Sequence, residues 1–298
     1  MANLRDVQLR MRAIRQTLQV TKAMNLISTA KLRKGRRVLE DTEPFFTRIQ
    51  KSMYDILAAA GHPQSEFFPR SGWSNSGGVR HSAVVAVTSD KGLAGGYNAN
   101  VCRCAAELCS RLKNPLLILI GSIGYRYFIH SPYLILENFS FRSRLPEVDD
   151  ARQIAEYIIS QYLWGMFDEV HLVYTHMYSA VKLQPAERQI LPLDAEAMKA
   201  DLARFDSRER AALQFEYIPS PEEVFDALVP LYIRGVVYGS LVEAYVSEQS
   251  ARMTAMEESS KNAEEMLADL QLHYNRARQA GITQEVTEII SGSTALND

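Results

Sequence analysis

The chain has 298 residues, 47% hydrophobic side chains and a formal net charge of −2, which suits one large domain or a domain with an extended element. Its cysteines, Cys102, Cys104 and Cys109, are an odd number unsuited to a disulfide framework, so a reducing compartment is the simpler interpretation. The first residues lack the apolar core of a signal peptide, and the longest apolar run, PLLILIG at 115–121, is too short to cross a bilayer. We therefore expect a soluble protein.

A long helix is predicted over residues 1–60. No proline occurs before Pro44, and side chains recur at steps of three and four, the period of a coiled-coil seam. The seam residues are Leu4, Val7, Met11, Ile14, Leu18 and Thr21. The segment is also basic, because residues 1–40 hold ten Lys or Arg and two Asp or Glu, a net charge of +8. Such a helix needs a partner that covers its seam.

A connection rich in Gly, Ser and Pro follows over residues 61–80 and leads into an α/β domain over residues 81–221. Strands and helices alternate in this domain, which predicts an open, largely parallel and Rossmann-like sheet. The strands are expected over residues 81–89, 115–121, 133–139 and 168–179, the helices over 98–112, 123–130 and 149–165, and a further extension of the sheet over 183–198.

A second long helix is predicted over residues 222–298, because no proline follows Pro230. Its seam comprises Val246, Gln249, Met253, Met256, Ser260, Ala263, Leu267, Leu270, Tyr274 and Ala277. The segment holds five basic and thirteen acidic side chains, a net charge of −8. Opposite charge and matching period predict that the two terminal helices pair as a long antiparallel coiled coil.

The two predicted helices differ in length. Residues 222–290 as one helix would span about 100 Å, whereas an N-terminal helix of about 55 residues covers roughly four-fifths of that length. We therefore expect the far tip of the C-terminal helix to stand nearly alone or inside another protein. The seam is also unusual, because Gln249, Ser260, Ala263 and Ala277 are small or polar. Close approach of two helices and a shaft that turns without sticking both remain open as explanations.

The loop SDKGLAGGYN at 89–98 follows a predicted strand and opens a helix, which is a place where phosphate often binds. Its spacing matches neither GxGxxG nor GxxxxGK[ST], so a tight strand-to-helix turn is the simpler interpretation. His171 and His176 are five apart on a predicted strand, hence on opposite faces. The three cysteines on a helix cannot face one point. We predict no catalytic residue, no cofactor and no metal.

Three stretches resemble one family: QVTKAMNLISTAKLRKGRR at 19–37, the glycine loop, and ARMTAMEESSKNAEEMLADLQLHYNRARQAGITQEVTEIISGSTAL at 251–296. The family is the γ subunit, or central stalk, of the F-type ATP synthase, and the resemblance runs from end to end. Ala94 stands where many members have cysteine. Gly281 departs from the usual alanine or serine and should weaken the helix by about 1 kcal/mol. The chain lacks the insertion of chloroplast members and a mitochondrial presequence, which indicates a bacterial type.

The resemblance implies a rotor. The helix pair would form a shaft inside a ring of three α and three β subunits, with the globular domain at the membrane end beside ε and the ring of c subunits. Proton or sodium flow would turn the shaft and drive the catalytic β sites through their states. The subunit would lie peripherally at the cytoplasmic face of the bacterial plasma membrane and touch the membrane only through the c ring. Nucleic acid is not an expected partner, because KLRKGRR lacks aromatic neighbours.

The same resemblance implies contacts with the α/β ring from Lys22, Met24, Arg252, Arg278, Gln279, Thr283, Glu285 and Glu288. Two other functions remain open. A coiled-coil adaptor would self-associate through its seams. A phosphate-binding α/β enzyme would bind its ligand at residues 91–98.

Overall fold

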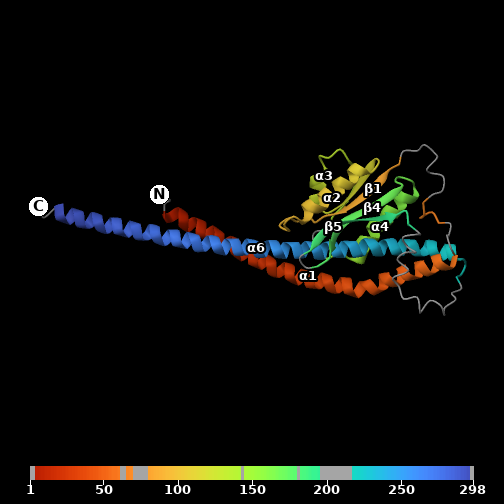
Figure 1. Cartoon of the computed structure of the whole chain (residues 1–298), viewed down its shortest axis with the longest axis horizontal. Helices are drawn as coiled ribbons and strands as arrows, with labels where there is room; N and C mark the ends of the chain where they lie inside the picture. Colours follow the sequence, from red (N-terminus) through yellow and green to blue (C-terminus); the bar gives the residue numbers. More distant parts are fainter. Residues whose placement is uncertain are drawn as a thin grey trace. The chain divides into compact units, whose positions relative to one another are not determined.

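The computed structural model describes residues 4–60, 65–69, 80–141, 144–179, 182–194 and 217–295, with the side chains of 58–60 and 291–295 left out. Two long helices enclose an α/β segment in the sequence (Figure 1). The elements are α1 (Leu4–Ala60), β1 (Ser82–Val87), α2 (Tyr97–Arg111), β2 (Pro115–Ile120), α3 (Ser122–Phe128), β3 (Leu134–Phe139), α4 (Val148–Leu163), β4 (Glu169–Met177), β5 (Leu183–Leu191) and α6 (Pro221–Ala295).

Two compact units make up the chain. The helix-pair unit contains Met1–Thr29 and Arg252–Asp298, and the α/β unit contains Ala30–Ala251. Both long helices contribute to both units, since α1 has 57 residues and α6 has 75. The predicted fold class is confirmed, because a pair of terminal helices accompanies a central α/β sheet. The division into four segments at 60, 80 and 221 stays a prediction, and most of the predicted connection at 61–80 lies outside the described residues.

The sheet has five strands in the order β3-β2-β1-β4-β5. β1 pairs in parallel with β2 and β4, β2 pairs in parallel with β3, and β5 runs antiparallel to β4. The sequences SAVVAV and PLLILI explain the central position of β1 and β2, because strands covered on both faces read as continuous apolar runs. The prediction of an open and largely parallel sheet is thus confirmed.

Helix α2 covers one face of the sheet. Its side chains Val101, Ala105 and Leu108 are buried in one cluster with Val84 of β1 and Leu117 of β2. These α2 positions recur every three or four residues, which is the spacing of one helix face. Phe128 of α3 belongs to the same buried cluster, so α3 helps α2 to cover this side of the sheet.

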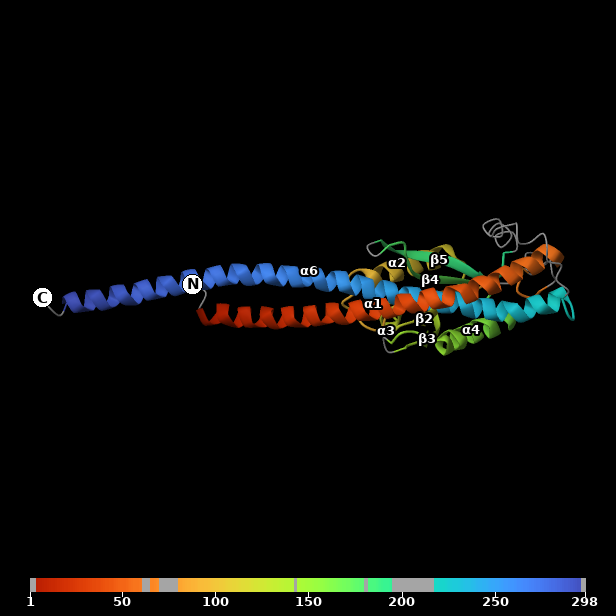
Figure 2. The same cartoon turned by 90° about the horizontal axis from the view of Figure 1, so that it is seen from below.

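Helix α6 lies against strand β4 within the α/β unit. In this unit it runs antiparallel to α1, as Figure 2 shows. The Ser247 hydroxyl donates to the Thr175 carbonyl at 3.2 Å. The Glu243 carboxylate accepts from the Met177 N–H at 3.0 Å and lies 2.5 Å from His176 Nδ1. These three contacts attach one side of α6 to the last residues of β4.

Helix α6 is apolar over part of its length. By length and composition alone it could cross a membrane, with a mean hydropathy of 1.3 in its most apolar window, of which 44% is buried inside the structure. Phe225, Val229, Ile233 and Val237 are all fully buried. Their four-residue spacing places them on one face, so packing within the α/β unit accounts for their apolar character.

Cysteine labelling tests the packing of α2. Burial raises the pKa of Cys102 to about 11 and that of Cys109 to about 12, from 9.0. Because the thiolate is the nucleophile, a shift to about 11 lowers its fraction at pH 8 about a hundredfold. We expect N-ethylmaleimide, followed by mass spectrometry, to label both thiols slowly in the folded chain and quickly in urea. Half-buried Cys104 serves as the internal reference and should react first. Equal rates at all three thiols would contradict the packing.

Candidate functional site

The helix-pair unit has the predicted seam. Val7 and Met11 of α1 and Met256 and Ala263 of α6 are buried, and no predicted seam residue is exposed. Gln8 Nε2 donates to the Tyr274 hydroxyl at 2.9 Å, 266 residues along the chain. The antiparallel coiled coil is thus confirmed in this unit.

A polar contact lies inside the seam. The hydroxyl oxygens of Thr21 and Ser260 are 2.7 Å apart, which is hydrogen-bonding distance. Two small hydroxyl side chains can meet this closely only because neither is bulky. Ala263, the next seam position on α6, is also buried. Close approach of the helices is therefore the explanation that the structure supports for Ser260 and Ala263.

The C-terminal tip, residues 279–290 of α6, extends past the last pairing contact with α1. Gln8 meets Tyr274, and only four described residues of α1 precede Gln8. Every side chain of the tip is exposed and Gly281 alone is half-buried. In the described part of the chain the tip therefore has no helix beside it, as the difference in helix length predicted.

Polar and apolar side chains both line the tip. Thr283 donates its hydroxyl to the Gln279 carbonyl at 2.9 Å, and Gln284 Nε2 donates to Glu288 at 3.0 Å. These bonds stay within the helix and leave the outer side of each group open to a partner. The predicted contact residues on this segment are Gln279, Thr283, Glu285 and Glu288, and Arg278 directly precedes it; all five are exposed.

An apolar stripe on the tip was missed by the sequence analysis. Ile282, Val286 and Ile289 are 51%, 48% and 71% exposed. They follow the i, i+4, i+7 spacing of one helix face, and this spacing was the available signal. Exposed apolar residues that share one helix face are typical of a surface that another chain covers.

The other three predicted contact residues lie on the paired part of the helices. Lys22 Nζ is 2.6 Å from a Glu264 carboxylate oxygen, and both side chains are more than half exposed. An exposed pair of this kind contributes about 0–1 kcal/mol, so a partner could replace it at little cost. Met24 is half-buried, and Arg252 is only 7% exposed.

These residues do not form one site. Arg252 and Arg278 are separated by roughly 40 Å of helix at 1.5 Å per residue. The structure places Lys22, Met24 and Arg252 along the paired helices, Arg278 directly before the tip and the remaining four on it. Their contacts with another subunit stay a prediction.

The glycine loop is held by its own chain. Ser89 N–H donates to Asn98 Oδ1 at 2.9 Å, and Asn98 Nδ2 donates to Ser89 Oγ at 2.8 Å. Asp90 Oδ1 accepts from the N–H and the hydroxyl of Ser122 and from the Ser140 hydroxyl, at 2.8–2.9 Å. These bonds tie the loop to α2, α3 and the end of β3. Gly95 has a φ of 55°, in the left-handed region that favours glycine. A tight turn explains this loop.

Helix α6 fills the space at the carboxyl ends of β1 and β2. In Rossmann-like sheets, ligands bind at this edge. The cavity there measures about 40 Å³, and its walls include Leu241, Ala244 and Tyr245 of α6. Ligand pockets are typically about 300–1,000 Å³. The room for a nucleotide is therefore taken by the chain's own helix.

The two histidines of β4 have different neighbours. His176 contacts Glu243 of α6, whereas the ring nitrogens of His171 lie 3.7 Å from Glu169 and 3.6 Å from Glu187. This confirms that they point to opposite faces of the strand. Across the described ranges, no group of three or more His, Cys, Asp or Glu side chains is arranged to hold a metal ion.

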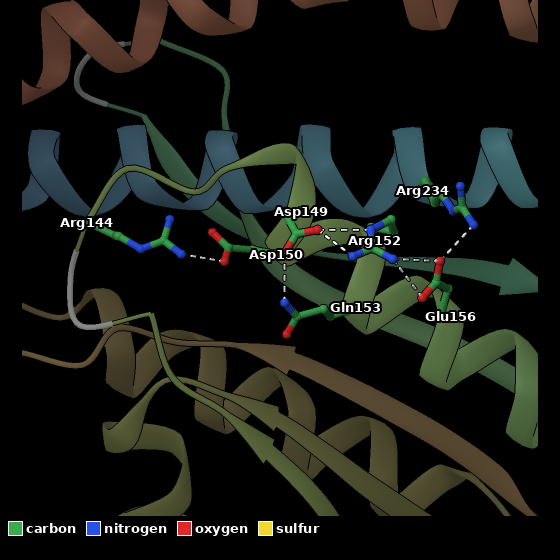
Figure 3. Close-up of polar contacts among 7 residues, drawn as sticks. All are labelled: Arg144, Asp149, Asp150, Arg152, Gln153, Glu156 and Arg234. Carbon is green, nitrogen blue, oxygen red and sulfur yellow. Dashed lines mark hydrogen bonds and ion pairs between the residues drawn. The ribbon is translucent and has the colours of Figure 1, made fainter.

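An ionic network joins α4 to α6 within the α/β unit (Figure 3). Glu156 of α4 accepts from Arg234 of α6 at 2.9 Å and from Arg152 at 3.4 Å. Arg152 also lies 2.6 Å from Asp149. Each exposed pair contributes about 0–1 kcal/mol alone, but a network that shares Glu156 restrains both helices together.

A second ionic contact belongs to the start of α4. Asp150 closes a capping box with Glu147, and its carboxylate lies 2.6 Å from Arg144. The side chain of Asp150 is almost fully buried, whereas Arg144 is about half exposed. A buried carboxylate needs such partners, because an unpaired buried charge is strongly destabilising. This cap fixes where α4 begins.

Replacing Thr21 tests the polar seam contact. Thr21→Val keeps the shape but leaves the half-buried Ser260 hydroxyl without its partner, so we expect a loss of about 1–2 kcal/mol in the free energy of unfolding. Urea titration followed by circular dichroism measures it. Thr17→Val is the matched control, because the Thr17 hydroxyl is exposed and bonds only within α1. Equal losses in both variants would show that the seam bond contributes nothing.

Comparison with known proteins gives the family. The family model described as ATP synthase matches residues 3–296. The ATP synthase gamma chain of Acetivibrio thermocellus is 40% identical over 297 residues, covering 99% of this chain and 100% of the relative. The gamma chain of Ruminiclostridium cellulolyticum is 41% identical over 295 residues, covering 99% of each. A chain of the Euglena gracilis mitochondrial ATP synthase shares the fold, with a TM-score of 0.66, 17% identity and coverage of 98% and 94%. The chain therefore belongs to the ATP synthase gamma-chain family.

Proposed function

We propose that the chain is the rotating central stalk of a bacterial ATP synthase and couples ion flow through the membrane sector to conformational change at the catalytic β subunits. One observation carries this proposal: the paired helices end in a single helix whose polar and apolar side chains are all exposed. An unaccompanied helix with an apolar face requires a surrounding surface. A ring of α and β subunits provides one.

The contacts of the tip must be both firm and replaceable. Arg278 and Gln279 are about 100° apart around the helix, while Gln279 and Thr283 share a face at i, i+4. Such side chains point toward several subunits rather than into one pocket. Hydrogen bonds to charged groups contribute about 1.5–3 kcal/mol each, and exposed ones less. Bonds of this strength can transmit torque and still be exchanged as the shaft turns.

The chain itself acts without a catalytic site in this proposal, and the chemistry of ATP belongs to its β partners. The bonded glycine loop and the cavity of about 40 Å³ beside it support this assignment. The intrachain seam of the helix-pair unit disfavours a self-associating adaptor, because that seam is already covered. Self-association would have to displace α1 from α6.

The α/β unit would dock with ε and the c ring, which places the subunit peripherally at the cytoplasmic face of the bacterial membrane. Supporting this, Tyr127 and Ile129 near the end of α3 and Leu134 of the edge strand β3 are about half exposed or more. Exposed apolar side chains on an edge strand and on the helix that precedes it favour a protein partner for these two elements.

Substitution at the tip tests the ring contacts. The double variant Arg278→Ala, Gln279→Ala should lower coupled ATPase activity of the assembled complex about tenfold, since it removes contacts of about 1–3 kcal/mol. The helix content of the isolated chain should not change, because both side chains are exposed. The control Lys261→Ala, Gln271→Ala removes one cation and one amide from exposed positions on the paired part of α6. An unfolded double variant, or equal activity losses in both, would make these residues structural.

Nucleotide binding separates the stalk from the enzyme alternative. We expect isothermal titration calorimetry of the isolated chain with ATP to show no saturable binding. The cavity at the carboxyl ends of β1 and β2 is far smaller than a nucleotide. Micromolar affinity that disappears in Lys91→Ala would contradict this and favour a phosphate-binding site at residues 91–98. Retained affinity in that variant would place the nucleotide elsewhere on the chain.

A further inference from the structure

Two glycines inside the long helices lie where α1 and α6 meet in the α/β unit. Gly35 belongs to α1 and Gly235 to α6, and both are buried. Glycine is disfavoured in a helix interior relative to alanine, so its presence there needs a packing reason. The surroundings of each supply one.

Each glycine accepts a bulky side chain of the other helix. A Cβ atom on Gly235 would lie 2.2 Å from the ring of Phe46 on α1. A Cβ atom on Gly35 would lie 2.7 Å from Val246 Cγ2 and 3.3 Å from Tyr245 on α6. Both distances to the nearest atom are too short for any real side chain. The two contacts are therefore reciprocal, because each helix provides one glycine and one bulky side chain. We call Gly35 and Gly235 the notches, and Phe46 and Val246 the knobs.

The spacing makes the two contacts act together. Phe46 follows Gly35 by 11 residues, and Val246 follows Gly235 by the same number. Eleven residues are three turns of helix, so each notch and knob share one face about 16 Å apart. In antiparallel pairing both knobs meet both notches only in one register. Sliding one helix by a few ångströms brings both knobs onto side chains.

A third glycine differs from these two, because no side chain of α1 packs against it. Gly239 lies one turn after Gly235 on α6, and a Cβ atom there would meet nothing within 4 Å. It opens into a groove of about 390 Å³ whose walls include Phe46 and Thr42. The groove gives the Phe46 ring room to move aside if its own notch were filled. A variant at Gly235 can thus remain folded and still lose the contact.

We propose that Gly35 and Gly235 are positioning residues that lock the axial register of α1 against α6, so that neither helix slides along the other while the rotor carries load. This inference rests on the proposed function for the load, but the lock itself is a property of the chain alone. A rotor that slipped at this point would let ATP hydrolysis continue without moving ions.

Coupling in the assembled complex tests the lock. We expect Gly235→Ala to lower the ratio of ions pumped to ATP hydrolysed about tenfold, since overpacking a core contact changes the population of the native arrangement by about that factor. Adding Phe46→Ala to Gly235→Ala should raise the ratio to that of Phe46→Ala alone, because the clash between the Gly235 Cβ position and the Phe46 ring is then gone. Gly35→Ala should behave like Gly235→Ala and be relieved by Val246→Ala. Gly239→Ala, on the same helix and facing open space, should leave the ratio unchanged.

Three results would overturn the proposal. Equal effects of Gly235→Ala and Gly239→Ala would show a general response of the helix to alanine. A fall in hydrolysis and pumping by the same factor would show only loss of folded subunit. If Gly235→Ala does not fold, Phe46→Ala decides, because it removes the knob without a clash, and an unchanged ratio there would refute the lock. Failure of the proposed function is distinct, because the unsubstituted complex would then pump no ions.

Discussion

The structure depends on covering a helix of 75 residues. A helix of that length gains little from its own hydrogen bonds in water, and its stability comes from packing an apolar face against something else. Helix α6 meets this need over part of its length. In the α/β unit it packs beside α1 and strand β4, and in the helix-pair unit beside α1, whereas the side chains of the tip are exposed.

The way in which α6 is covered also decides what the α/β sheet can do. A Rossmann-like sheet normally offers the carboxyl ends of its strands to a ligand. Here Leu241, Ala244 and Tyr245 take that space, and Asp90 and Asn98 bond within the chain. The sheet thus holds the helix at the position where other proteins of this architecture hold a nucleotide. The same residues that could mark a binding loop are structural ones.

The sequence predicts the elements well because they follow periodic rules. The a/d seam from Leu4 to Thr21 and the apolar runs at β1 and β2 depend only on side-chain spacing, and both are confirmed. The antiparallel direction of β5 could not be predicted, because its sequence LQPAERQIL indicates a strand but no partner. Helix α3 begins at Ser122, directly after Gly121 and one residue earlier than expected. It ends at Phe128, two residues earlier than expected.

The site was predictable only in part. Exposure of Arg278 and Glu285 follows from the excess length of α6 over α1, which can be counted in the sequence. Burial of Arg252 does not follow, because it depends on which side chains surround one position of the helix pair. The contact between Gly235 and Phe46 could likewise not be predicted from the sequence. The two residues are 189 positions apart in the chain, and only the register of the helix pair brings them together.

The solitary tip has a consequence for the life of the subunit before assembly. A helical segment of about 12 residues without tertiary neighbours is marginally stable in water, so its backbone opens far more often than that of the paired helices. Opened backbone that carries Ile282, Val286 and Ile289 is a substrate for proteases and a surface for chaperones. Enclosure by partner subunits would end both exposures. The same apolar residues that a partner would cover in the assembled complex are thus the ones that distinguish a free copy of this chain from an assembled one.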